Sequence, residues 1–159
     1  MSHSQKYCLV SFNRPLEINA KFEMTDWPLH ITLADVFAIN LGSDLVKKLK
    51  ELFSDERPVI TAANKDAVLG EAKVVLLEKN DKIKNLHQHL VDLLESNGAV
   101  FNNPEFTKEG FLPHCTIQKD ERLNLGDKII INEITLVDMF PNNNWKKRKV
   151  LYSFKLKGE

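Results

Sequence analysis

The sequence predicts an α+β protein built mainly of antiparallel strands. Short apolar stretches rich in β-branched residues come in groups that only two helix-like segments separate. The resulting order of strands, helix, strands, helix, strands lacks the regular alternation of a doubly wound parallel sheet. One short motif also occurs twice, at a separation of 84 residues, and each copy has its own strands and one helix. We therefore expect two related lobes within one compact domain over residues 1–159.

The first third of the chain predicts two strands separated by a loop. Residues 7–12 are typical of a strand and end at a turn-like Asn-Arg-Pro segment. Residues 16–26 predict a loop with a short helical turn. The second strand covers residues 29–33 and continues through residues 36–39.

Two amphipathic helices are expected. The first runs from about residue 43 to residue 55, with Ser43 as its N-cap, and the second has Asp81 as its N-cap and ends before Gly98. Each helix carries one apolar stripe at helical spacing, formed by Leu45, Leu49, Leu52 and Phe53 in the first and by Ile83, Leu86, Leu90 and Leu94 in the second.

Five further β segments are expected. Residues 59–62 and 73–78 predict two strands joined across a loop that ends at Gly70. Residues 111–118 carry the second copy of the motif. Residues 128–136 and 150–156 predict β-rich segments near the end of the chain.

The overall charge argues against a protein that grips long nucleic acid by net charge. Lysine plus arginine equals aspartate plus glutamate, at 22 each. A small anionic ligand or an oligonucleotide end needs only a local basic patch. The N-terminus has no apolar signal core and no run approaches the roughly 18 apolar residues of a membrane span, so we expect a cytoplasmic protein with no membrane attachment. Cys8 and Cys115 lie in expected strands and are interpreted as buried free thiols.

The repeated motif is His-x-Thr within an apolar strand behind a proline. It reads His-Ile-Thr-Leu at residues 30–33 and His-Cys-Thr-Ile at residues 114–117. Successive side chains of a strand point to opposite faces, so each histidine shares a face with its threonine. By chance, a hydroxyl residue two positions after a histidine is expected about 0.4 times in a chain of this composition. The two copies of the motif therefore indicate a chemical role for these residues.

Two such pairs suit the cleavage of a phosphodiester. An imidazole titrates near pH 6.5, so one histidine can accept a proton from water while the other donates one to the departing oxygen. The hydroxyls of Thr32 and Thr116 can donate hydrogen bonds to the non-bridging phosphate oxygens. This chemistry requires neither a metal nor a cofactor.

The two tetrapeptides resemble the signature of the two-histidine (2H) phosphoesterases, which include the bacterial 2′-5′ RNA ligase-like proteins and the 2′,3′-cyclic phosphodiesterases. The similarity extends to the proline before the second histidine, the motif separation and the order of elements. It implies a bilobal fold with two antiparallel sheets that form a central cleft and with helices on the outside. It also implies His30 and His114 as acid and base, Thr32 and Thr116 as phosphate binders, and a cyclic or 2′-linked phosphodiester of a nucleotide or RNA end as substrate. No obligate protein partner is implied.

The competing interpretations are a structural role and a zinc site. A single histidine in a strand is usually structural, but the matched pair favours catalysis. Zinc needs a third ligand on the same side, and Cys115 should point away from His114. His87 and His89 lie about 200° apart on a helix, so we expect His87 at the edge of the core and His89 in solvent.

Four other residues are weaker candidates for substrate contacts. Arg14 follows the first strand, and Lys119 lies three residues beyond Thr116. Trp145, beside a basic run at residues 146–149, can stack on a base, although such a run is more often a solvated strand edge. Tyr7 is interpreted as an aromatic wall or, preferably, as a core residue.

Two alternative functions stay open at this point. The first is a nucleotide-binding or sensor module that keeps the cleft without catalysis. The second is a 2′-5′ RNA ligase that runs the reverse reaction. Intact proton-transfer groups in both motifs favour the hydrolase.

Overall fold

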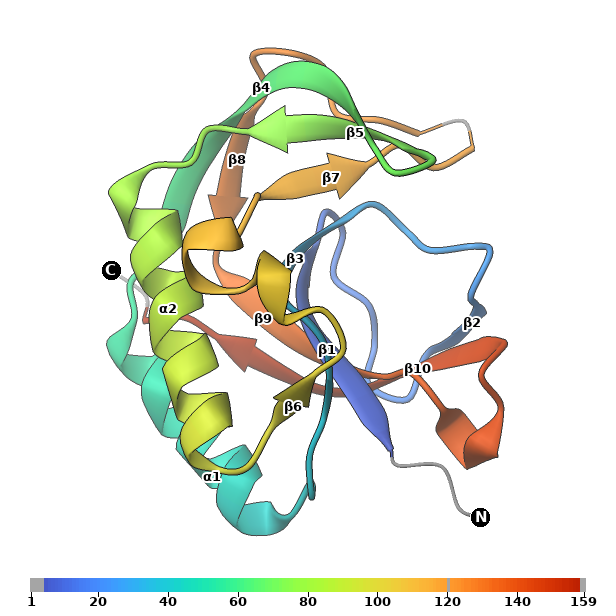
Figure 1. Cartoon of the computed structure of the whole chain (residues 1–159), viewed down its shortest axis with the longest axis vertical. Coiled ribbons are helices and arrows are strands. Elements are labelled where there is room, and N and C mark those ends of the chain that lie inside the picture. The colour runs from blue at the N-terminus through green and yellow to red at the C-terminus, as the bar shows by residue number, and fades with distance from the viewer. Residues whose placement is uncertain (1–4, 120, 158–159) are drawn as a thin grey trace.

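The computed structural model describes residues 5–119 and 121–157, and it confirms the predicted α+β class (Figure 1). The helices are α1 (Ser43–Asp55) and α2 (Asp81–Ser96), with short 3-10 turns η1 (Pro104–Phe106), η2 (Lys108–Gly110) and η3 (Pro141–Asn143). The strands are β1 (Lys6–Phe12), β2 (Lys21–Glu23), β3 (His30–Ala38), β4 (Val59–Leu69), β5 (Ala72–Leu77), β6 (Val100–Phe101), β7 (His114–Thr116), β8 (Lys128–Ile131), β9 (Glu133–Asp138) and β10 (Lys147–Lys155).

All strand pairs are antiparallel, and the two expected sheets join into one hydrogen-bonded path. Its order is β2-β10-β9-β1-β3-β7-β5-β4-β8, with β6 paired to the side of β3. Figure 1 shows β4, β5, β7 and β8 in the upper half of the molecule and β1, β9, β10 and β2 in the lower half. The β3–β7 pair joins these halves, so the two motif-bearing strands are immediate neighbours at the middle of the path.

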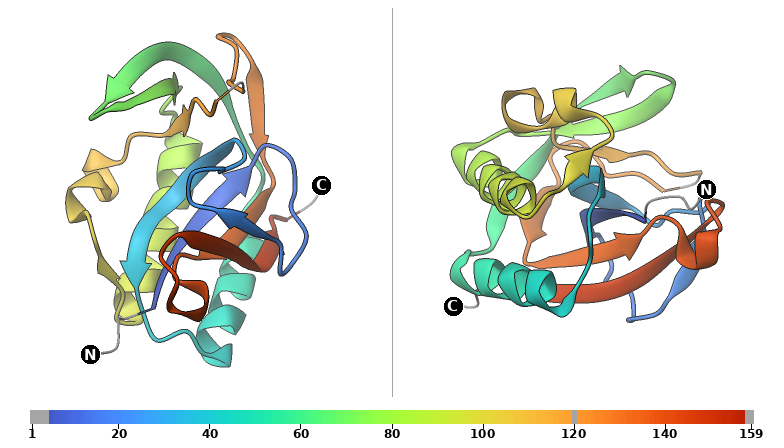
Figure 2. Two further views of the ribbon diagram at one scale, coloured as in Figure 1. Left: turned by 90° about the vertical axis from the view of Figure 1, so that its right-hand side faces the viewer. Right: turned by 60° about the horizontal axis from the view of Figure 1, so that its bottom comes forward.

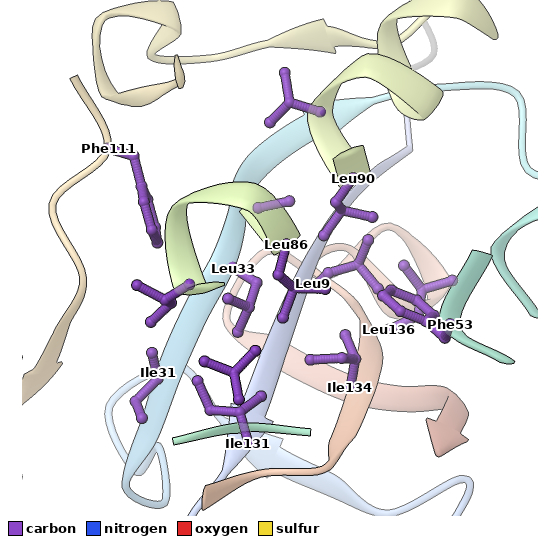
Figure 3. Packing of buried hydrophobic residues seen from close by; sticks show 14 of the residues in the cluster. Leu9, Ile31, Leu33, Phe53, Leu86, Leu90, Phe111, Ile131, Ile134 and Leu136 are labelled. Atoms are coloured by element: carbon purple, nitrogen blue, oxygen red, sulfur yellow. The ribbon is translucent and has the colours of Figure 1, made fainter. Parts of the chain in front are cut away.

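Both helices cover the same face of the sheet. In the left view of Figure 2, α2 lies behind β1 and β3, and α1 lies lower, by β10. Figure 3 shows Leu86 and Leu90 of α2 meeting Leu9 and Leu33 of the two central strands, and all four are fully buried. Burying one such side chain contributes about 1.5–3 kcal/mol, so this interface fixes the strands firmly against the helices.

The face turned away from the helices carries a smaller apolar cluster. Alternation along β1 places Leu9 in the main core, while Cys8 and Val10 belong to the second cluster with Val137. Partly buried aromatic residues pack against this cluster, namely Phe12, Phe22 and Trp27. The second face is therefore also lined with apolar side chains, and the candidate site lies beside them.

The helix boundaries agree with the prediction, but both N-caps differ from it. Gly42, with extended backbone and no side-chain bond, caps α1, and Ser43 is the first helical residue. The side chain of Asn80 caps α2 by accepting a hydrogen bond from the backbone N–H of Ile83, and Asp81 begins the helix. Asn and Asp have nearly equal preferences for the N-cap position. Because Asn80 and Asp81 are adjacent, the loop geometry decides which of them caps the helix. Gly98, at φ +90°, ends α2 as expected.

The strand predictions need three corrections. Residues 16–26 contain β2, a short strand paired with β10, instead of a helical turn. β4 continues to Leu69 and meets β5 through a tight turn at Gly70, so most of the expected loop is strand. The second motif strand is only three residues long, since 3-10 turns occupy the chain up to Gly110. Among the described residues, no helix has the length and apolar character that crossing a bilayer requires.

Candidate active site

The two His-x-Thr motifs lie side by side in the sheet. Ile31 of β3 stands directly opposite Cys115 of β7 in an antiparallel pair. Continuing this register by one residue in each direction places each histidine opposite the threonine of the other motif. His30 therefore faces Thr116, and the two histidines are diagonal neighbours.

All four polar side chains of the motifs share one face. Ile31 and Cys115 point into the helix-covered core, where they are 5% and 2% exposed, so the residues on either side of them point away from it. Side chains directly opposite each other have Cβ atoms about 5 Å apart, and diagonal neighbours are about 7 Å apart. Two imidazoles at this separation can reach opposite sides of one phosphate group.

Apolar residues border this polar group on both neighbouring strands. On β1 they are Phe12 and Val10, opposite His30 and Thr32 respectively. On β5 they are Val74 and Leu76, opposite Thr116 and His114 respectively. A hydrogen bond or charge beside such surroundings is less screened than one in open water.

Both imidazoles are oriented by main-chain carbonyls. Nδ1 of His30 lies 2.9 Å from the carbonyl oxygen of Pro28, and Nδ1 of His114 lies 2.8 Å from that of Leu112. A carbonyl oxygen only accepts, so each Nδ1 must carry the proton and donate it. In the neutral ring this leaves Nε2 unprotonated, so Nε2 is the nitrogen that can accept a proton.

The two histidines differ in their surroundings. The imidazole of His30 packs against the indole of Trp27, with ring centroids 4.4 Å apart, and meets the Phe12 ring at 6.0 Å in an edge-on arrangement. Burial lowers the pKa of His30 below 6.5, the hydrogen bond to the Pro28 carbonyl opposes this shift, and the nearby His114 lowers the pKa further. The two rings are thus close enough to disfavour simultaneous protonation.

The two cysteines are buried thiols, Cys115 on the motif strand β7 and Cys8 on β1. Burial raises the pKa of the Cys115 thiol to about 11 and that of the Cys8 thiol to about 12. Both cysteines are free, as predicted, and they lie in different apolar clusters. Neither thiol is therefore ionised to a significant extent near neutral pH.

A third histidine ties the two motif strands together from the core side. His87 of α2 is 2% exposed, and its Nδ1 donates to the carbonyl of Leu33, 2.6 Å away. Its Nε2 accepts a hydrogen bond of 3.0 Å from the backbone N–H of Lys108, and its ring stacks on Phe111 with centroids 3.8 Å apart. His87 thus links the first motif strand to the segment that leads into the second. His89 lies on the outer side of α2 and pairs with Glu56.

The four weaker candidates fall in different places. Lys119 borders a pocket of about 350 Å³ with Trp27 and pairs with Asp26 at 2.6 Å. Arg14 is exposed in the loop after β1. Trp145 is 55% exposed before β10, beneath the ammonium group of Lys146. Tyr7 is 6% exposed in the main core against Phe37, so the structure does not bring it to the site.

Trp27 and Arg148 were not singled out from the sequence, yet Trp27 borders His30 and Arg148 lies against Trp27. The Arg148 guanidinium lies over the Trp27 indole, with Cζ 5.9 Å from the ring centroid. The expectation that residues 146–149 form a solvated edge is wrong for Arg148, since Nη1 donates to three main-chain carbonyls. A tryptophan three residues before the histidine was the available signal, but nothing in the sequence indicates its partner.

No cluster of three or more His, Cys, Asp or Glu side chains suited to a metal ion occurs within residues 5–119 and 121–157. The site is thus described by two imidazoles, two hydroxyls and their aromatic border.

An α+β fold whose antiparallel sheet carries two adjacent His-x-Thr strands is the arrangement expected of a 2H phosphoesterase. The family model of the 2′-5′ RNA ligase superfamily matches residues 14–145. The chain therefore belongs to the 2′-5′ RNA ligase superfamily, and the resemblance noted in the sequence is confirmed. No curated protein shows a significant sequence match.

Solved structures share the fold at low sequence identity. A crystal structure described as a phosphoesterase superposes with a TM-score of 0.61 at 16% identity, covering 98% of this chain and 100% of that one. E. coli LigT in complex with NADP+ gives a TM-score of 0.61 at 15% identity, covering 99% and 100%. A Thermus thermophilus protein, TT0787, gives 0.58 at 17% identity, covering 97% and 99%. Family and fold together support phosphoesterase-type chemistry.

Proposed function

We propose that this protein is a metal-independent phosphodiesterase that hydrolyses 2′,3′-cyclic phosphate or 2′-5′-linked ends of nucleotides or RNA. The observation that carries the proposal is the Ile31–Cys115 register, which brings both His-x-Thr motifs onto one face of adjacent strands. A single histidine in this setting would be structural, but two diagonal imidazoles supply an acid and a base together.

The proposed reaction is an in-line displacement at phosphorus. One Nε2 takes a proton from the attacking water, and the other Nε2–H gives its proton to the departing sugar oxygen. Thr32 and Thr116, each opposite a histidine, donate hydrogen bonds to the non-bridging oxygens, where the transition state carries its negative charge. The carbonyls of Pro28 and Leu112 keep both rings in the reactive tautomer throughout.

The substrate class follows from the size of the site and from the relatives. Two imidazoles whose Cβ atoms are about 7 Å apart can hold one phosphate between them. Structures of E. coli LigT have been solved in complex with 3′-AMP and with NADP+. A ribonucleotide phosphate on the same face of this sheet is consistent with both points.

The test is turnover of a short RNA ending in a 2′,3′-cyclic phosphate, measured in EDTA. We expect the wild type to open the ring, and His30→Ala and His114→Ala to lose at least about 100-fold in kcat/KM. His89→Ala is the matched control, because His89 lies on the outer side of α2. Circular dichroism melting verifies that each variant is folded.

Activity that chelation abolishes, or that survives loss of either motif histidine, contradicts the proposal. Tight binding of a mononucleotide without any product over hours would favour the non-catalytic module instead. Adding an RNA with a 5′-hydroxyl end to the same assay tests the reverse reaction, since the same acid and base serve both directions. A joined 2′-5′ product would identify a ligase.

A further inference from the structure

The environment of His30 is unlike that of its partner. Two aromatic rings, Trp27 and Phe12, border the His30 imidazole, and Phe22 in turn meets the Trp27 ring edge-on at 4.9 Å. His114 has no ring contact of this kind among the described residues and its hydrogen bond lies in an exposed position. The His30 imidazole is therefore enclosed by aromatic rings to a greater extent than the His114 imidazole.

Arg148 holds the indole from β10. Its Nη1 donates to the carbonyls of Met139, Trp145 and Lys147 at 3.1, 2.7 and 2.9 Å, which fixes the guanidinium on the Trp27 ring. Burial lowers the pKa of Arg148 from its ordinary value, yet a guanidinium keeps its charge at any pH of an assay. Trp27 consequently lies against both a permanent cation and an imidazole that can become one.

The charges around His30 oppose its protonation. His114 lies diagonally across on β7 and lowers the pKa of His30. Arg148 of β10 lies against the Trp27 indole, and the Asp138 carboxylate acts on Arg148 with the opposite charge. Lys128 of β8 lines the same small pocket as His30, of about 240 Å³, and Lys119 beyond β7 is paired with Asp26. The face of an indole attracts a cation, but the Trp27 indole already has the Arg148 guanidinium against it. A proton on His30 is therefore disfavoured.

We propose that Trp27 and Arg148 are positioning residues that keep His30 neutral, so that His30 is the general base and His114 the general acid. This inference rests on the proposed function, since it assigns roles within that reaction. Water enters on the side of His30, which takes its proton, and the new P–O bond forms there. The P–O bond to the sugar breaks on the other side, where His114 gives its proton to the departing oxygen. Solvent then returns one proton to His114 and removes one from His30.

The positioning role is tested by titrating His30 with NMR, which requires no activity. Trp27→Ala and Arg148→Met are each expected to raise the midpoint of His30 by about half a pH unit or more. Trp27→Phe and Arg148→Lys, which keep the ring and the charge, are expected to stay close to the wild type. Trp145→Ala, a tryptophan that does not contact His30, is the control for its titration. If Trp27→Ala does not fold, the two Arg148 variants carry the comparison alone. A midpoint that is unchanged in both Trp27→Ala and Arg148→Met, or in Arg148→Met alone when Trp27→Ala is unfolded, overturns the role.

The assignment of acid and base is tested with a sulfur leaving group. In a cyclic substrate whose departing ring oxygen is replaced by sulfur, the thiolate leaves without being protonated. Sulfur is placed at the 2′ position in one substrate and at the 3′ position in another. The substrate whose P–S bond the wild type cleaves is used in the comparison. His114→Ala should be at least about 100-fold slower on the oxygen substrate but within about tenfold of wild type on the sulfur substrate. His30→Ala should be equally slow on both.

Failure of this inference can be distinguished from failure of the proposed function. Rescue of His30→Ala instead of His114→Ala by sulfur reverses the roles and overturns this inference, while the phosphodiesterase stands. If the wild type turns over neither substrate, the proposed function fails, and the NMR titration alone still decides whether Trp27 and Arg148 govern the protonation of His30.

Discussion

Ile31 and Cys115 face each other across β3 and β7, and this single pair sets the geometry of the candidate site. A shift of the register by one residue would turn one motif's histidine and threonine into the core, because side chains alternate along a strand. The buried pair is therefore what keeps both motifs on the same face.

The threonines are predicted to act through their hydroxyls alone. Thr32→Val and Thr116→Val keep a β-branched side chain in a strand, so the fold should be preserved. Each substitution removes a donor to the charged phosphate oxygens, and we expect kcat/KM to fall by about 10- to 100-fold. Steady-state kinetics on the cyclic-phosphate substrate checks this, and an unchanged kcat/KM in both variants would exclude the phosphate-binding role.

Lys119 and Asp26 should have opposite effects on substrate binding. Lys119 pairs with Asp26 in an exposed position at the pocket beside Trp27. We expect Lys119→Ala to raise KM for an anionic substrate about two- to fivefold, and Asp26→Asn to lower it. Both effects should fade at high salt, where exposed charges are screened. Lys50→Ala, on the solvent side of α1, is the control, and an equal change there would point to net charge alone.

His87 is predicted to stabilise the fold far more than its neighbour His89. His87→Phe keeps an aromatic ring against Phe111 but leaves the Leu33 carbonyl and the Lys108 N–H without their partner. We expect the free energy of unfolding to drop by about 2–3 kcal/mol. The same substitution at the exposed His89 should cost less than about 1 kcal/mol. Urea unfolding measures both, and equal losses would contradict the bridging role.

The free energy of unfolding should also fall as the pH drops below about 6.5. Burial lowers the pKa of both His30 and His87 in the folded state. The unfolded chain then takes up protons that the folded chain does not, so the stability is complete above the unfolded pKa and declines towards the lower folded values. Urea unfolding between pH 8 and pH 5 should show a shallower decline for His87→Phe than for wild type. Burial raises the pKa of Asp138, but this is common to both proteins and cancels in the comparison.

How well each element could be predicted depends on whether its cause is local. The two helices, the motifs and the left-handed Gly98 follow from periodicity and backbone preference. β2 was missed because Lys21–Glu23 has no apolar run and is a strand only through its pairing with β10. The polar middle of β4 was missed for the same reason, because it is a strand only through its pairing with β5.

The same distinction between local causes and distant pairing applies to the candidate site. The four motif residues follow from a repeated pattern, but their direct adjacency depends on strands 84 residues apart in the sequence. The Trp27–Arg148 contact joins a loop to a distant strand, so it has no sequence period that would reveal it.

The carbonyls of Pro28 and Leu112 have a consequence for how this site can diversify. A main-chain acceptor is the same whatever side chains surround it, so the protonation pattern of both rings does not depend on any neighbouring residue type. In the proposed reaction, substitutions in the loops around Asp26 and Lys119 would then alter which substrate is accepted while Nε2 remains the reacting atom. The choice of substrate and the proton transfer are thereby free to change independently.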